Sequence, residues 1–182
     1  MINSIWFKHT GVAAIGFGLI GASIYMLMIN VTLVHIEAVS GQIPFDMRPF
    51  GYGPADAEAL LRALGAEGRQ YYLSHQIPLD TIYPAMLALT LIATIVWFAR
   101  RMPNSKLIRF GVILSVGAAL FDYAENLGIM TLIWSWPDLP TALVFATSTA
   151  TIAKSVLTTF AALSTLIIGC NWVRLSKADL RS

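Results

Sequence analysis

Three polar side chains interrupt the otherwise apolar stretch FDYAENLGI, which covers residues 121–129. Asp122, Glu125 and Asn126 fall on one face of a helix at 3.6-residue spacing. Carboxyl groups can exchange a proton or bind a cation, and a carboxamide can hold a ligand through hydrogen bonds. The spacing therefore predicts a polar helix face able to carry chemistry, and its meaning depends on what surrounds the helix.

A second polar stripe lies later in the chain. Within residues 141–173, one helix face carries Thr147, Ser148, Thr151, Lys154, Ser155 and Thr158. The link SWPDLP between the two stretches is short enough to make an antiparallel helical hairpin. Because unsatisfied polar groups are costly in lipid, we expect the two stripes to face each other inside a bundle.

The hairpin matches Asp122 with Lys154 in depth. Both lie about 16 positions from a turn near residue 138, which is about 24 Å along each helix at about 1.5 Å per residue. A lone charge at the bilayer centre costs at least ~2.5–3.5 kcal/mol, so we predict an ion pair between the two residues. Glu125 lies one turn further out, opposite Thr151 and within reach of Lys154.

Two carboxylates and one ammonium leave one negative charge to be balanced. Glu125 could be protonated through desolvation, bind a cation, contact water in a cavity, or be reached by Arg69 or His75. One hypothesis makes Glu125 or Asp122 a catalytic acid or base, with Lys154 setting their charge. The alternative is that these polar groups only cross-link helices through hydrogen bonds.

The composition is that of a membrane protein. Of 182 residues, 57% are hydrophobic and 12% are charged, against roughly 45–50% and 25% in soluble domains. The sequence predicts an all-α bundle of four transmembrane helices in a single membrane domain, residues 1–182. The four apolar stretches that reach the required ~20 residues are about 10–36, 79–99, 107–134 and 141–173. A net charge of +2 does not suggest nucleic-acid binding, and the single Cys170 cannot form an intrachain disulfide.

The basic residues predict the orientation of the chain in a cell membrane. The connection between the second and third stretches carries Arg100, Arg101, Lys106 and Arg109, and the tail carries Arg174, Lys177 and Arg181. The first connection is instead rich in acids, so the positive-inside rule places both termini in the cytoplasm. Trp6, Trp97 and Trp172 would then lie at the inner interface, and Trp134 and Trp136 at the outer one.

The segment GFGLIG at residues 16–21 matches a dinucleotide-binding pattern, but no strand precedes it. We interpret it as part of a smooth helix face. Ala14, Gly18 and Ala22, at four-residue spacing, would let another helix approach closely.

The outer connection, residues 37–78, is too long for a simple link. Pro54 suits a first helical position, and Leu60, Leu61 and Leu64 make one apolar stripe. We expect an amphipathic helix on the outer face, with a role as a lid favoured over a role in docking a partner.

The outer end of the bundle offers further candidate ligand-binding residues. Asn30 and His35 close the first helix, Asp80 and Tyr83 open the second, and Arg69 and His75 lie in the loop above. With Asn126 and Thr151 they could line a cleft open to the outside. The two histidines do not match in depth as haem ligands would, and no His or Cys cluster has zinc spacing. No metal site and no particular cofactor is predicted, although a cation held by Asp122 and Glu125 stays open.

Three motifs carry a resemblance to a known family. LGAEGRQYY at 64–72, LDTIYP at 79–84 and FDYAENLGI at 121–129 resemble an uncharacterised family of four-helix integral membrane proteins. Its members share an LG-x-EGR-x-x-Y loop, a D-x-x-[FY]-P start of the second helix and a D-Y-x-E-N segment in the third. The resemblance implies the four-helix topology and the importance of Arg69, Asp80, Asp122, Glu125 and Asn126, and it implies no reaction.

Two hypotheses about function follow. The first is a membrane-embedded enzyme or binding protein for a membrane lipid or small amphiphile, with the polar cluster as its site. The second is a non-catalytic accessory or scaffold subunit whose buried polar residues only specify helix packing. Association into a homo-oligomer or a larger membrane complex is compatible with both.

Overall fold

The computed structural model describes residues 4–102 and 105–179, and within them the chain is all-α. The helix α1 (Ser4–Leu27) runs through the π-helical turn η1 (Met28–Thr32) into α2 (Leu33–Ser40). Likewise α3 (Pro54–Tyr71) runs through the π-helical turn η3 (Tyr72–Gln76) into α4 (Ile77–Phe98). The helices α5 (Lys106–Trp134) and α6 (Thr141–Asp179) follow, and the 3₁₀ turns η2 (Phe45–Met47) and η4 (Ala99–Arg101) lie in the connections.

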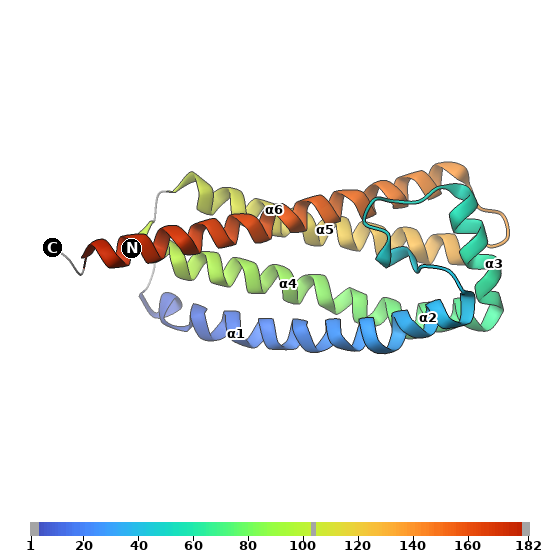
Figure 1. Cartoon of the computed structure of the whole chain (residues 1–182), viewed down its shortest axis with the longest axis horizontal. Coiled ribbons are helices and arrows are strands. Elements are labelled where there is room, and N and C mark those ends of the chain that lie inside the picture. Colours follow the sequence, from blue (N-terminus) through green and yellow to red (C-terminus); the bar gives the residue numbers. More distant parts are fainter. Residues whose placement is uncertain (1–3, 103–104, 180–182) are drawn as a thin grey trace.

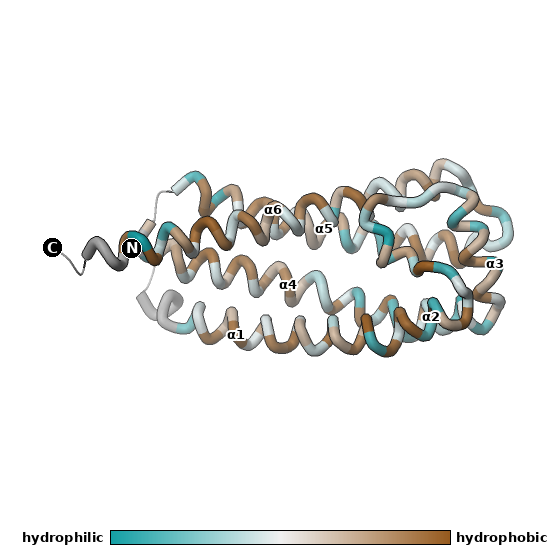
Figure 2. The backbone as a smooth tube through the Cα atoms, in the orientation of Figure 1, coloured by the Kyte–Doolittle hydropathy of each residue, from teal (hydrophilic) through white to brown (hydrophobic). Residues whose placement is uncertain are grey.

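Four helical stretches are long and apolar enough to cross a membrane, as the sequence predicts. They are His9–Ser40, Pro54–Phe98, Lys106–Trp134 and Thr141–Leu175. In Figure 1 the long helices lie side by side, α3 crosses one end of the bundle, and α1 begins and α6 ends at the opposite end. The helix α1 packs mainly on α4, α4 also packs on α5, and α5 packs on α6. Hydrophilic residues gather in the half of the bundle next to α3 (Figure 2).

The helix α3 begins at Pro54, as expected, and the Asp56 carboxylate accepts the backbone N–H of Gly53 at 2.9 Å. Its buried side chains join an apolar cluster at the end of the bundle, to which α5 contributes Ile129 and Leu132. The buried α3 residues are Ala57, Leu60, Leu61, Leu64 and Gly68. This helix therefore closes one end of the bundle, and the position of that end outside the cell stays a prediction.

The loop of residues 41–53 turns back into the bundle and lies against α6 (Figure 1). Phe45 and Tyr52 are buried, and the Tyr52 backbone N–H donates to Ser148 Oγ at 2.8 Å. Gly51 has φ +85°, and a Cβ at this position would lie 2.6 Å from Ser148 Oγ. Irregular backbone is tolerated at membrane depth only where protein or a cavity shields it. We call residues 41–53 the re-entrant loop; the sequence did not predict its inward course.

The close contact between α1 and α4 differs in part from the predicted face. A Cβ on Gly18 would lie 3.4 Å from Thr90 Cγ2, and one on Gly21 would lie 3.3 Å from Met86 Cβ. Ala22 is exposed. The glycines that permit the approach are thus Gly18, Gly21 and also Gly11, where a Cβ would lie 3.2 Å from Trp97 Nε1. A series at four-residue spacing turns gradually away from the neighbouring helix, because one turn has about 3.6 residues.

Candidate functional site

The polar stripes of α5 and α6 face each other, as the hairpin predicts. Lys154 Nζ lies 3.4 Å from Asp122 Oδ1 and also contacts Glu125 Oε2. Thr151 Oγ1 donates to Glu125 Oε1 at 2.7 Å. The predicted pairing of Asp122 with Lys154 and the position of Glu125 opposite Thr151 are both confirmed. One ammonium therefore bridges two carboxyl groups that stand one helical turn apart.

The hairpin is tight near the turn because Gly128 has no side chain. A Cβ built on Gly128 would lie 2.8 Å from Thr147 Cβ and closer still to the Thr147 hydroxyl. Small residues let membrane helices approach closely, and this contact holds the two stripes within hydrogen-bonding distance.

Asn126 reaches a different helix. Pro84 lies inside α4 and has no N–H, so it cannot bond the carbonyl of Asp80 four residues before it. The Asn126 side-chain amide donates to that carbonyl at 2.8 Å. Asp80 and Asn126 are both buried, so the carboxamide satisfies a backbone acceptor that would otherwise be stranded.

A further acid, Asp46, enters the site from the re-entrant loop. Its carboxylate accepts hydrogen bonds from the Tyr72 hydroxyl and, at 3.4 Å, from Gln76 Nε2. The Gln76 side-chain oxygen Oε1 in turn accepts a hydrogen bond from the Thr32 hydroxyl. Thr32 and Gln76 belong to the two π-helical turns, η1 and η3, a local geometry that recurs at functional sites.

Asp46 belongs to the acid-rich outer connection and is not among the site residues predicted from the sequence. A signal was present, because Asp46 stands in the stretch IPFDMRPF with Ile43, Phe45, Met47 and Phe50 around it. A loop with so many apolar side chains has a reason to enter a bundle rather than remain in water.

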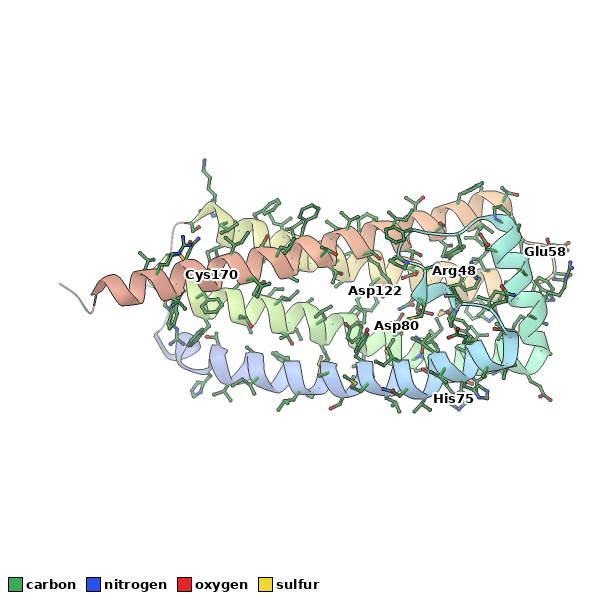
Figure 3. All side chains as sticks on the ribbon, viewed as in Figure 1. Arg48, Glu58, His75, Asp80, Asp122 and Cys170 are labelled. Atoms are coloured by element: carbon green, nitrogen blue, oxygen red, sulfur yellow. The ribbon has the colours of Figure 1, made fainter. Side chains whose placement is uncertain are left out.

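A cavity of about 310 Å³ lies where these elements meet. Asp46, Asp80, Asp122 and Lys154 line it, from the loop, α4, α5 and α6 respectively. Asp80 and Asp122 lie near one another in the interior of the bundle (Figure 3). The Asp80 side chain is buried, and its Oδ2 has no hydrogen-bond partner among the described residues.

The cavity opens on the side of the bundle. Three of its lining residues, Tyr25 on α1, Met47 in the loop and Thr159 on α6, are exposed. The Tyr25 ring stacks on that of Tyr83, with 5.5 Å between the centroids, and Met28, Leu33 and Leu87 add apolar lining. The mouth is therefore aromatic and apolar, whereas the interior is charged.

Several predicted site residues lie outside the cavity lining. Arg69 donates to the Leu61 carbonyl at 2.7 Å and lies over the Trp136 ring. Its contacts therefore connect α3 with the turn between α5 and α6. The ring of Tyr71 stacks on His75 and contacts His35, both of which are exposed.

Asn30 is exposed and donates to the Met26 carbonyl of its own helix. None of these groups lines the cavity that holds Asp80, Asp122 and Lys154. An apolar cluster that includes Phe45, Leu60 and Tyr72 packs at the α3 end of the bundle.

Glu125 contacts Lys154 and Asn126 bonds the Asp80 carbonyl, but neither residue lines the cavity. Glu125 is fully buried and contacts Lys154, whereas the Asp122 side chain is 10% exposed and lines the cavity. Asn126 likewise is absent from the lining. Of the predicted catalytic residues, Asp122 and Lys154 are thus the ones in a position to touch a ligand.

Acidic side chains outnumber basic ones in the site. Lys154 is the one cation among the described lining residues, and it faces Asp46, Asp80 and Asp122 with Glu125 behind. No group of three or more His, Cys, Asp or Glu in the described chain is arranged to hold a metal ion. In the loop, burial and the nearby Glu125 carboxylate raise the pKa of the Tyr52 phenol well above its usual range, so Tyr52 adds no charge.

Comparisons with protein-family models, with curated proteins and with solved structures found no match for this chain. They identify no family, and the resemblance of the three motifs to other four-helix membrane proteins stays a prediction.

Proposed function

We propose that this chain is a multi-pass membrane protein that holds the polar head of a membrane lipid or small amphiphile in the lateral cavity. The observation that carries the proposal is the Asp80 carboxyl group, which is buried, lacks a partner for Oδ2 among the described residues, and lines the cavity. A buried polar atom without a partner costs free energy, and a ligand in the cavity would remove that cost.

The position of the mouth supports an amphiphile over a wholly polar ligand. Tyr25, Met47 and Thr159 border the opening on the side of the bundle. Apolar side chains are exposed beside it, including Met26 on α1 and Phe160 on α6. A head group could enter the charged interior while its hydrocarbon chain stayed in the bilayer.

We also infer that both termini lie in the cytoplasm of a cell membrane and that α3 covers the outer end. The support is the basic residues at the α1-start end of the bundle, including Arg100 and Arg174, against the acids Asp56, Glu58 and Glu67 on α3.

Recovery of bound lipid from purified protein tests the binding function. Thr159→Trp should fill the mouth from the exposed face of α6 and lower the amount of lipid that copurifies. Thr149→Trp is the matched control, because Thr149 is also exposed on α6, also bonds a carbonyl of its own helix, and lies outside the cavity lining. Equal lipid content in both variants and the parent, by mass spectrometry, would refute the proposal.

The scaffold alternative has its own support. Asn126 and Thr151 are engaged in hydrogen bonds between helices, as a packing role would require. Under that alternative no lipid occupies the cavity, so the same lipid measurement decides between the two functions. A role for Asp122 as acid or base would become testable once a bound molecule is identified.

A further inference from the structure

The cavity is lined by more acidic than basic side chains. Three carboxyl groups, those of Asp46, Asp80 and Asp122, line it from three different elements, and Lys154 is the one cation among the described lining residues. Lys154 already contacts Asp122 and Glu125, so it does not balance the other two acids. A ligand that enters this space would gain most by bringing a positive charge.

The hydrogen-bonding capacity of the site points to the same kind of ligand. Asp46 accepts hydrogen bonds from two uncharged groups, the Tyr72 hydroxyl and the Gln76 side-chain amide. Asp80 is 2% exposed, and its Oδ2 has no partner within the described chain. The Asp80 Oδ2 atom is thus a buried acceptor that a donor on the ligand would satisfy, and a primary ammonium carries three N–H groups.

The size and the mouth of the cavity limit the rest of the ligand. A volume of about 310 Å³ is at the lower end for ligand sites and suits a head group rather than a whole lipid. Tyr25 and Tyr83 stack on one another beside the charged interior, and an aromatic face also attracts a cation. The tail must leave between α1 and α6, past Tyr25 and Met47.

We propose that the cavity is specific for amphiphiles with a primary ammonium head, which donates an N–H to Asp80 beside the acids Asp46 and Asp122 while the hydrocarbon chain leaves between α1 and α6. The inference rests on the proposed function and narrows it to a ligand class. A single-chain amine and an aminophospholipid both supply this head group.

The test compares ligands that share one chain and differ in the head group. Purified protein in decyl maltoside micelles receives dodecylammonium, dodecyltrimethylammonium, dodecanol or dodecyl sulfate at equal mole fraction, and the shift in Tm is measured. Dodecylammonium should raise Tm most. The quaternary analogue should bind more weakly, because it cannot donate hydrogen bonds to Asp80.

Variants separate specific binding from partitioning into the micelle. Asp80→Asn, nearly isosteric, should weaken dodecylammonium binding at least roughly tenfold. Asp138→Asn is its control, since Asp138 is exposed in the α5–α6 turn. Thr159→Trp should abolish the Tm shift and Thr149→Trp should preserve it, which gives a second line of evidence from outside the charged cluster.

The outcomes distinguish the two proposals. The part of a ligand's Tm shift that is lost in Thr159→Trp reports binding in the cavity. If this part is larger with dodecanol or dodecyl sulfate than with dodecylammonium, the ammonium preference is overturned and amphiphile binding still holds. Equal binding of the primary and quaternary amines, or an unchanged affinity in Asp80→Asn, would overturn the assigned hydrogen bonds. If every ligand shifts Tm equally in the parent and in Thr159→Trp, both proposals are overturned. Competition by dioleoylphosphatidylethanolamine would support a membrane lipid as the source of the head group, and its absence would support a free amine.

Discussion

The contact between Asn126 and the Asp80 carbonyl gives a sharp test of why a carboxamide stands in FDYAENLGI. Asn126→Leu keeps the number and branching of the side-chain heavy atoms and removes the donor at 2.8 Å from that carbonyl. Because Pro84 offers the carbonyl no helical N–H, the oxygen would be left buried and unbonded. Stranding such a group costs about 1–3 kcal/mol, and we expect a loss of unfolding free energy in that range.

The loss of unfolding free energy in Asn126→Leu should depend on Pro84. In Pro84→Ala, the new backbone N–H can bond the Asp80 carbonyl and complete the helix. Asn126→Leu should then cost less than half of what it costs in the parent, which is a coupling of about 0.5–2 kcal/mol between the two positions.

Unfolding of the four proteins of this cycle in mixed micelles, with sodium dodecyl sulfate as denaturant, measures the coupling. Asn30→Leu is the matched control, because Asn30 also donates to a helix carbonyl at 2.8 Å but from an exposed position. It should change stability by less than about 0.5 kcal/mol. An equal cost of Asn126→Leu with Pro84 and with Ala at this position would refute the reasoning.

The remaining predictions concern the ion pair, the hairpin contact and the orientation. Lys154→Met should destabilise the protein by about 3–5 kcal/mol because it strands two acids. When combined with it, Glu125→Gln should restore more of that loss than Asp122→Asn, since Glu125 is fully buried and Asp122 faces the cavity. Simple additivity in denaturant unfolding would argue against these contacts. Gly128→Ala should cost about 1–3 kcal/mol by pushing α5 from Thr147, whereas Gly16→Ala, with open space around it, should be neutral or slightly stabilising; similar effects on Tm would contradict the close packing. The orientation can be tested with an impermeant thiol reagent on intact cells, in a Cys170→Ala background. A cysteine at Ser105 should be shielded, and one at Ala59, which is exposed on α3, should react. The reverse labelling would overturn the orientation.

The part of the site that could be predicted is the part fixed by helix geometry. A short turn and a 3.6-residue period determine which residues of an antiparallel hairpin meet, so the contact of Lys154 with Asp122 followed from counting. The contact of Asn126 with the Asp80 carbonyl could have been found as well. Pro84 identifies that carbonyl as unbonded, and a buried carboxamide on the neighbouring helix is a suitable donor.

The re-entrant loop could not be placed from the sequence by the same means. Residues 41–53 have no helical period that would fix their position, and their anchors lie far along the chain, as with the Tyr52 N–H on Ser148. The expected outer cleft with Arg69 and His75 depended on an open end of the bundle. Apolar side chains from the loop and α3, including Phe45 and Leu60, occupy that end instead.

The three polar residues of FDYAENLGI have different neighbours because each points in a different direction. At about 100° per residue, Asn126 lies about 40° from Asp122 around α5, and Glu125 lies about 60° to the other side. Asp122 therefore lines the cavity, Glu125 turns toward α6 and contacts Lys154, and Asn126 turns toward the proline-interrupted α4. Lys154 and Asp80 both line the cavity, and Glu125 and Asn126 contact them from behind its walls. The helix-packing contacts of this segment are therefore compatible with the binding function that we propose for the cavity.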